Sequence, residues 1–187
     1  MNLLTILLLL IINLNQIFGS EIVVTTKNGQ IKGHQVFNSK QLVNEFIGIR
    51  YAKPPIGELR FKKPQPEGNW TGVYNATLRR NVCMQNNIYG EIPKLYGSEM
   101  GEDCLFLNVW TTNTSASQPV FVWIHGGGFV AGAGLEKRKN GTALASYHVT
   151  VVSLEYRLGP FGFLYGGNQD APGNVGFYDQ LMALTWV

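Results

Sequence analysis

The apolar residues of this chain fall in short runs that polar or glycine-rich segments separate. Short runs rich in Val, Ile, Leu and Phe predict β-strands. Such runs cover residues 22–26, 46–49, 105–110, 120–124 and 150–156. Asn28-Gly29 and the return segment 30–32 follow the first run, so residues 22–33 predict a β-hairpin.

Helical periodicity occurs in two places. Residues 142–148 predict a short helix, and a longer amphipathic helix begins at about Gly176. Met182, Trp186 and Tyr178 share one face of this helix, at a spacing of four residues. The pattern reaches Val187 with no glycine, proline or basic last turn to end it, which favours a chain truncated within a longer domain.

The order of these elements predicts the fold class. Short strands come first, and a strand–loop–helix–strand unit follows them. Pro54-Pro55, Pro64 and Pro66 disfavour regular structure and predict a surface loop between the two groups. We therefore expect an α/β protein with a mixed sheet that starts antiparallel and then turns parallel, with crossover helices.

The first 20 residues predict a secretory signal peptide. Leu3 to Ile12 is almost wholly apolar, but about ten residues are too few to span a bilayer. Gly19 and Ser20 are small enough to form a cleavage point. We expect a secreted, extracellular protein whose folded part is 21–187. Membrane attachment is expected only if the signal is uncleaved or a longer parent protein is anchored.

Composition agrees with a secreted globular domain. The 187 residues are 45% hydrophobic and carry a net charge of +3. The basic clusters 62–63 and 137–139 predict solvated loops, so we expect no nucleic-acid partner. Sequons of the N-x-S/T type predict N-glycosylation at Asn69, Asn75, Asn113 and Asn140.

Cys83 and Cys104 are the two cysteines of the chain. In an oxidising compartment they most simply form one disulfide, which would close a loop of about 20 residues and stabilise the fold by about 3 kcal/mol. Two cysteines without a C-x-x-C spacing make a poor metal site. We therefore expect neither a metal ion nor a cofactor.

The most informative segment follows the predicted strand 120–124. His125 and three glycines, Gly126 to Gly128, come directly after the apolar run. A glycine loop after a strand lets backbone N–H groups point at an anion without Cβ atoms in the way. His-Gly-Gly-Gly in this position is typical of the oxyanion-hole loop of lipases and esterases with the α/β-hydrolase fold.

From about Glu21 to Val187 the sequence resembles the N-terminal part of the type-B carboxylesterase/cholinesterase family of α/β-hydrolases. Five blocks in the same order carry this resemblance: Phe46 to Phe61, with Arg50 where proline is usual; Glu102 to Val109; Gly126 to Gly128; Val152 to Leu164, with Glu155 where asparagine is usual; and Ala171 to Gln180. The resemblance implies an α/β-hydrolase fold, of which this chain holds the N-terminal part.

The resemblance also implies roles for the glycine loop. Gly127 and Gly128 match the family's oxyanion donors, while His125 and Gly126 support the loop, and a third donor follows the nucleophile. Each such donor is worth about 3 kcal/mol of transition-state stabilisation.

Two structural features are implied by the same resemblance. Cys83 and Cys104 match the family's first disulfide, beside the mouth of the active-site gorge. Arg60 and Glu102 match a structural ion pair.

The family's nucleophile does not occur in this chain. Its serine sits in a Gly-x-Ser-x-Gly elbow that follows the helix on which the chain ends, and no such elbow is present. Ser98 follows a glycine but precedes Glu and Met, and His34 and His148 predict surface or helix-end positions. We expect the parent protein to be a serine carboxylic ester hydrolase that forms an acyl-enzyme, and the chain as given to be inactive.

The substrate expected for the parent enzyme is a small-molecule carboxylic ester. In cholinesterases a tryptophan that stacks on choline should lie between the two cysteines, and no tryptophan occurs from Cys83 to Cys104. Cation–π recognition of a quaternary ammonium would lose a main element. This favours a general carboxylesterase over an acetylcholine hydrolase, although an acetylcholinesterase-like fragment stays an alternative.

Three other interpretations stay open at this point. Residues 126–131 satisfy G-x-G-x-x-A after a strand, with Glu155 near the end of the next strand, which is the outline of a dinucleotide site. The family also includes non-catalytic adhesion proteins resembling neuroligins. A truncated gene product or incomplete gene model is the third.

Overall fold

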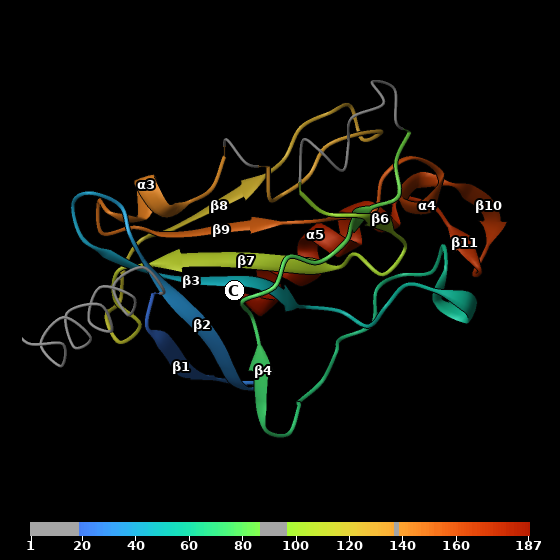
Figure 1. Ribbon diagram of the computed structural model, residues 1–187. Helices are drawn as coiled ribbons and strands as arrows, with labels where there is room; N and C mark the ends of the chain where they lie inside the picture. The colour runs from blue at the N-terminus through green and yellow to red at the C-terminus, as the bar shows by residue number, and fades with distance from the viewer. Residues whose placement is uncertain (1–18, 87–96, 137–138) are drawn as a thin grey trace, which may run out of the picture.

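A seven-stranded mixed sheet forms the centre of the computed structural model, which describes residues 19–86, 97–136 and 139–187 (Figure 1). The strand order is β1-β2-β3-β7-β9-β8, and β4 pairs with β2. The strands are β1 (Glu21–Thr26), β2 (Gly29–Phe37), β3 (Leu42–Arg50), β4 (Val73–Asn75), β7 (Phe106–Thr111), β8 (Val120–Ile124) and β9 (Thr150–Leu154). Most of the signal-peptide prediction lies outside the described residues.

The remaining elements are short, apart from the last helix. Two strand pairs lie outside the main sheet: β5 (Val82–Cys83) with β6 (Met100–Gly101), and β10 (Tyr165–Asn168) with β11 (Ala171–Pro172). The helices are η1 (Gly57–Leu59), α3 (Thr142–Ala145), α4 (Gly159–Phe163) and α5 (Val175–Trp186). No helix among the described residues is both long and apolar enough to cross a membrane.

The pairing confirms the predicted fold class. β1, β2, β3, β7 and β9 pair antiparallel in turn, and β8 pairs parallel with β9. The strand–loop–helix–strand unit is therefore a parallel crossover from β8 through α3 to β9. Because β9 is inserted between β7 and β8, these two strands are successive in the main sheet's sequence order but are not neighbours in the sheet.

The hairpin is confirmed, but its turn lies one residue earlier than predicted. Thr26 pairs with Gly29, so Lys27-Asn28 forms the turn instead of Asn28-Gly29. The Thr26 hydroxyl donates to the Gly29 carbonyl at 2.8 Å and accepts the Asn28 N–H at 3.2 Å. Side-chain bonds of this kind stabilise a turn that a dipeptide preference does not identify.

Both faces of the sheet carry a core. Leu107 on β7 packs in the cluster that includes Ile49, Leu154 and Ala183 of α5, whereas Trp110 belongs to a second cluster with Ala145 of α3. Side chains alternate between the two faces along a strand, so residues 107 and 110, which are three positions apart, point to opposite faces of the sheet. Figure 1 shows α5 lying against the sheet, which accounts for the first of these clusters.

β8 is an exposed edge strand, although its apolar run is typical of a buried strand. Val120, Phe121 and Ile124 are 51%, 48% and 38% exposed. β9 covers one edge of β8, and within the described ranges no strand pairs with the other edge. An apolar run indicates a strand that can be buried, but neighbouring elements supply the burial.

The two predicted helices also differ from the pattern. α3 ends at Ala145, and His148 beyond it has φ +61°, a left-handed conformation that no helix continues. In α5 the buried residues are Val175, Gly176, Asp179 and Ala183, while Tyr178 is 39% exposed. Met182 and Trp186 flank this face and pack against the core, so only these two members of the predicted face are confirmed.

Candidate functional site

The glycine loop leaves the end of β8 at the surface of the protein. His125 turns inward, and residues 126–130 are exposed. Gly127 has φ +123°, and its carbonyl accepts the N–H groups of Val130 and Ala131, both at 3.1 Å. A Cβ atom on Gly127 would lie 1.8 Å from the Ala131 carbonyl oxygen, so the tight turn requires glycine at this position.

Phe129 continues the turn in a left-handed conformation, with φ +62°. Such a conformation costs a non-glycine residue about 1–3 kcal/mol. Its ring contacts those of Phe163 and Phe177 at centroid distances of 5.2 and 5.4 Å, and its carbonyl accepts the Gly159 N–H at 2.7 Å. Two ring contacts at about 0.5–1.5 kcal/mol each, with one hydrogen bond, are enough to offset the strain.

The loop exposes two backbone donors. Gly127 and Gly128 are both exposed, and among the described residues neither N–H has a hydrogen-bond acceptor. Adjacent glycines with positive φ form a concavity that favours anions, because no Cβ atom shields the N–H groups. The arrangement can stabilise negative charge on an oxygen atom.

His125 lies beneath this loop and is 4% exposed. Its Nδ1 donates to the Gly126 carbonyl at 3.0 Å, and its ring stacks on Tyr156 at a centroid distance of 4.5 Å. The Tyr156 hydroxyl donates to the His125 carbonyl at 3.0 Å. Burial lowers the pKa of His125, which favours the neutral imidazole.

Glu155 lies beneath the loop; the sequence indicated it as a departure from the family pattern and as the acidic residue of a possible dinucleotide site. Its Oε1 accepts the Gly134 N–H at 2.7 Å, and its Oε2 lies 4.0 Å from His125 Nε2. Burial raises the pKa of Glu155 to about 8, although the backbone of Gly134 and Leu135 opposes the shift. The sequence did not predict this contact. It joins Glu155, at the end of β9, to His125 and Gly134 at the two ends of the glycine loop, and these lie more than 20 residues away in the chain.

A second support comes from the segment after Cys83. The predicted Cys83–Cys104 disulfide is present, with a Cα–Cα distance of 4.9 Å. Gln85 forms two hydrogen bonds with the Gly132 backbone, one to its N–H and one to its carbonyl, both at 2.8 Å. The disulfide segment is therefore attached directly to the glycine loop, and sequence reasoning missed Gln85.

A hollow of about 430 Å³ lies between these two segments. Its lining is mostly apolar and comes from the disulfide segment, the glycine loop and α4: Met84, Gln85, Asn86, Val130, Gly159, Pro160 and Phe161. An apolar hollow next to backbone donors is the kind of site that can hold a small organic substrate.

Two ion pairs lie at the base of the proline-rich loop. Arg60 Nη2 donates to Glu102 Oε1 at 2.9 Å, and this hydrogen bond raises the pKa of Arg60. Arg50, where proline is usual, donates to Asp103 Oδ2 at 2.9 Å and stacks on Phe106 at 4.4 Å. The structure thus brings Arg60 and Glu102 together as an ion pair.

A fully buried ion pair joins the end of β9 to α5. Arg157 donates from Nε and Nη2 to the two carboxylate oxygens of Asp179 at 2.8 and 2.7 Å, and its backbone N–H adds a bond at 3.1 Å. Burial raises the pKa of Asp179 and the three Arg157 contacts oppose the shift. Sequence reasoning missed this pair, although both residues lie in the quoted family blocks.

The other predicted residues lie outside the loop. His34 pairs across strands with Glu45, with Nε2 3.1 Å from Oε1, and His148 follows α3 at the surface. The four sequon asparagines are exposed at Asn69, Asn75, Asn113 and Asn140. Within the described ranges, no group of three or more His, Cys, Asp or Glu side chains could hold a metal ion.

Residues 126–131 do not form a dinucleotide site. That site needs a helix directly after the glycines. Here residues 128–130 form a turn, and α3 begins only at Thr142. Glu155 is buried against Gly134, so it cannot bind a ribose hydroxyl.

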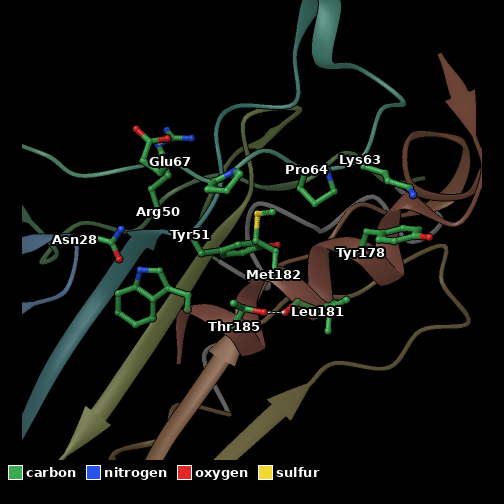
Figure 2. Close-up of a pocket in the computed structure, with 12 residues that line it drawn as sticks. Asn28, Arg50, Tyr51, Lys63, Pro64, Glu67, Tyr178, Leu181, Met182 and Thr185 are labelled. Atoms are coloured by element: carbon green, nitrogen blue, oxygen red, sulfur yellow. Dashed lines mark hydrogen bonds and ion pairs between the residues drawn. The ribbon is translucent and has the colours of Figure 1, made fainter. Parts of the chain in front are cut away.

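A second hollow, of about 380 Å³, lies between the proline-rich loop and the outer part of α5 (Figure 2). Tyr178, Leu181, Met182 and Thr185 line its helix side, and Lys63, Pro64 and Glu67 come from the loop. None of the predicted catalytic residues contributes to it.

The comparisons with known proteins agree with this geometry. The chain is 45% identical over 177 residues to a cholinesterase of Mus musculus, which covers 89% of this chain and 29% of that protein. It is 41% identical over 174 residues to acetylcholinesterase 4 of Caenorhabditis briggsae, with the same two coverages. The chain therefore spans less than a third of the length of these relatives. Residues 20–187 match the Carboxylesterase family, and the chain belongs to that family.

Proposed function

We propose that the protein of which this chain forms a part hydrolyses small carboxylic esters through a serine acyl-enzyme. The exposed pair Gly127 and Gly128 carries the proposal: the pair is held from below, on a loop whose Val130 lines an apolar hollow. Their N–H groups would donate to the oxygen on which negative charge develops when a nucleophile attacks the ester carbonyl. The nucleophile, its acid–base partners and a third donor lie outside this chain.

The geometry suits this step because the donors are set before substrate arrives. The Gly127 turn, the Phe129 ring contacts and the buried His125 all restrain the loop. Donors that need no reorganisation stabilise the transition state more than flexible ones do. The hollow of about 430 Å³ would hold part of the ester next to them.

We propose a neutral carboxylic ester as the preferred substrate. The two relatives are named as cholinesterases, so choline esters are the natural competing class. Against them, no tryptophan lies between Cys83 and Cys104 to stack on a quaternary ammonium. Most of this segment lies outside the described residues.

Hydrolysis of p-nitrophenyl butyrate and of butyrylthiocholine tests the proposal. We expect no turnover by residues 21–187 alone, and turnover with a preference for the neutral ester once the coding sequence beyond Val187 is included. An elbow with alanine or glycine in place of serine in that extended sequence, or its inactivity on both esters, would show a non-catalytic protein. Robust turnover by residues 21–187 alone would refute the proposal that the nucleophile lies outside this chain.

Gly128→Ala in the extended protein tests the oxyanion role directly. A Cβ at this position meets no atom within 4 Å, so folding should survive, but it would stand next to the exposed donors. We expect a loss in kcat of about a hundredfold or more. Gly72→Ala is the matched control, because Gly72 also has a positive φ, +76°, and open space around it, but lies outside the loop. Equal activity of the two variants would contradict the role of Gly128.

We also propose that the protein is secreted after cleavage of residues 1–20 and carries N-glycans. The exposure of the four sequon asparagines supports this. A shift in mass on glycosidase treatment of secreted protein, lost in stepwise Asn→Gln variants, checks it; a secreted product with no such shift would contradict it.

A further inference from the structure

We propose that Glu155 is a positioning residue for the glycine loop and that its carboxyl group is protonated on Oε2, the oxygen that faces Nε2 of His125. The structural claim concerns this chain alone. Only its effect on catalysis rests on the proposed function.

The hydrogen bond at the other side of the imidazole sets the tautomer. His125 Nδ1 lies 3.0 Å from the Gly126 carbonyl oxygen, and a carbonyl can only accept. Nδ1 therefore carries a proton. In a neutral imidazole this leaves Nε2 as an acceptor, facing Glu155.

Unless it is protonated, the Glu155 carboxyl group places an acceptor oxygen opposite Nε2 of His125, which is itself an acceptor. Oε1 is occupied by the Gly134 N–H, while Oε2 is buried and has no partner, as is His125 Nε2. The two atoms are 4.0 Å apart, in an interior where the residues are each 4% exposed. Two facing lone pairs in a dry site repel, and one proton between them removes the repulsion.

That proton belongs on the carboxyl group. An imidazolium facing a carboxylate would bury two charges whose nearest atoms are 4.0 Å apart, without a direct hydrogen bond between them. The neutral acid and neutral imidazole avoid this cost. The directions of the two pKa shifts, raised for Glu155 and lowered for His125, agree with the neutral pair.

The surrounding titratable groups do not supply a competing charge. The hydroxyl of Tyr51 donates to the Glu155 carbonyl at 2.7 Å, and that of Tyr156 donates to the His125 carbonyl. Arg157 is held by Asp179, and Lys139 further disfavours a charged His125. No cation among the described residues contacts the Glu155 carboxyl group.

The consequence for the loop follows from where Glu155 contacts it. Oε1 binds the N–H of Gly134 at the end of the loop, and Oε2 faces His125 at its start. A single carboxyl group thus joins both stems of the segment that carries Gly127 and Gly128. Loss of its proton would place a carboxylate against the Nε2 lone pair and weaken the start of the loop.

Nitrogen NMR of the histidine rings in the secreted protein tests the pair. We expect an unprotonated Nε2 and a protonated Nδ1 on His125 at pH 7, and a change in its resonances at about pH 8. In Glu155→Gln the amide can donate to Nε2 and accept from Gly134, so the tautomer should persist and the alkaline change should vanish. His34, paired with Glu45, serves as the internal control and should be unaffected.

An imidazolium at pH 7, a proton on Nε2, or an alkaline change that survives in Glu155→Gln would each overturn the proposal. If the variant does not fold, the titration of the wild-type protein still decides it. In the extended, active protein, we expect the ratio of kcat at pH 9 to kcat at pH 7 to be higher for Glu155→Gln than for the wild type. Absence of esterase activity would refute the proposed function and leave the NMR result intact.

Discussion

Two buried carboxyl groups, Glu155 at the end of β9 and Asp179 on α5, are held in opposite ways. Asp179 accepts three hydrogen bonds from Arg157, two of them charge-assisted. Glu155 is as deeply buried but faces only backbone N–H groups and a neutral imidazole. Since Glu155 and Arg157 flank Tyr156 at the end of β9, one short segment holds half of each pair.

The difference shows that burial by itself does not decide the charge of an acid. Desolvation raises the pKa of both carboxyl groups, but only Asp179 has a cation whose contacts oppose this. We therefore interpret the Arg157–Asp179 pair as an ionised link between the sheet and α5. The His125–Glu155 pair is a neutral link whose strength depends on one proton.

The largest expected effect comes from breaking the ionised pair. Asp179→Asn would leave the Arg157 charge buried without a counter-ion, which costs about 3–5 kcal/mol. We expect a loss of this size in the free energy of unfolding, measured by urea titration at pH 7. A loss below about 1 kcal/mol would show that the pair is not ionised.

A substitution at Gly132 can displace His125 and so disrupt the neutral His125–Glu155 pair. A Cβ on Gly132 would lie 2.2 Å from His125 Nδ1 and 2.3 Å from the Gly126 oxygen, and its φ is +128°. Gly132→Ala should therefore cost about 2–3 kcal/mol and displace the imidazole. Urea unfolding and the His125 NMR resonances measure the two effects. Gly72→Ala is the control, and equal effects of both variants would contradict the argument.

The pH dependence of stability separates the two pairs. Glu155 has its pKa raised from 4.5 to about 8, so between these values the folded state holds a proton that the unfolded state has lost. Its contribution to stability is present in full below pH 4.5 and falls as pH rises, by about 1.4 kcal/mol per pH unit.

Glu155→Gln removes this slope. Between pH 6.5 and 8 we expect the variant to gain about 2 kcal/mol relative to the wild type. Glu45 raises the pKa of His34, but His34 contributes equally to both proteins and cancels in the difference. Urea titrations at several pH values measure it, and parallel curves for the two proteins would contradict a protonated Glu155.

The smallest effect is expected at the partly exposed ion pair. Asp103 accepts two bonds from Arg50, but its side chain is 37% exposed. Solvent screens such pairs, so Asp103→Asn should cost less than about 1 kcal/mol at pH 7. Measured by the same urea titration, Asp103→Asn is the matched comparison for Asp179→Asn. A cost equal to that of Asp179→Asn would show that burial does not separate the two pairs.

Much of the fold could be predicted from local patterns. The hairpin, β8, β9 and α5 follow from runs and periodicities that act over a few residues, and the disulfide from the cysteine count. The His-Gly-Gly-Gly segment also placed the glycine loop after β8, where the Gly127 turn leaves no space for a Cβ. Boundaries and burial were less predictable, as the Lys27-Asn28 turn and the exposed β8 show.

The sequence by itself determined the family, the order of the elements and the position of the glycine loop, because these depend on short-range patterns and on matching blocks. Only the tertiary structure decided what holds the loop. Glu155, Gln85 and Asp179 act on partners 21, 47 and 22 residues away in the chain. Contacts of that kind depend on strand order and burial, and they determine whether a carboxyl group carries a charge or a proton.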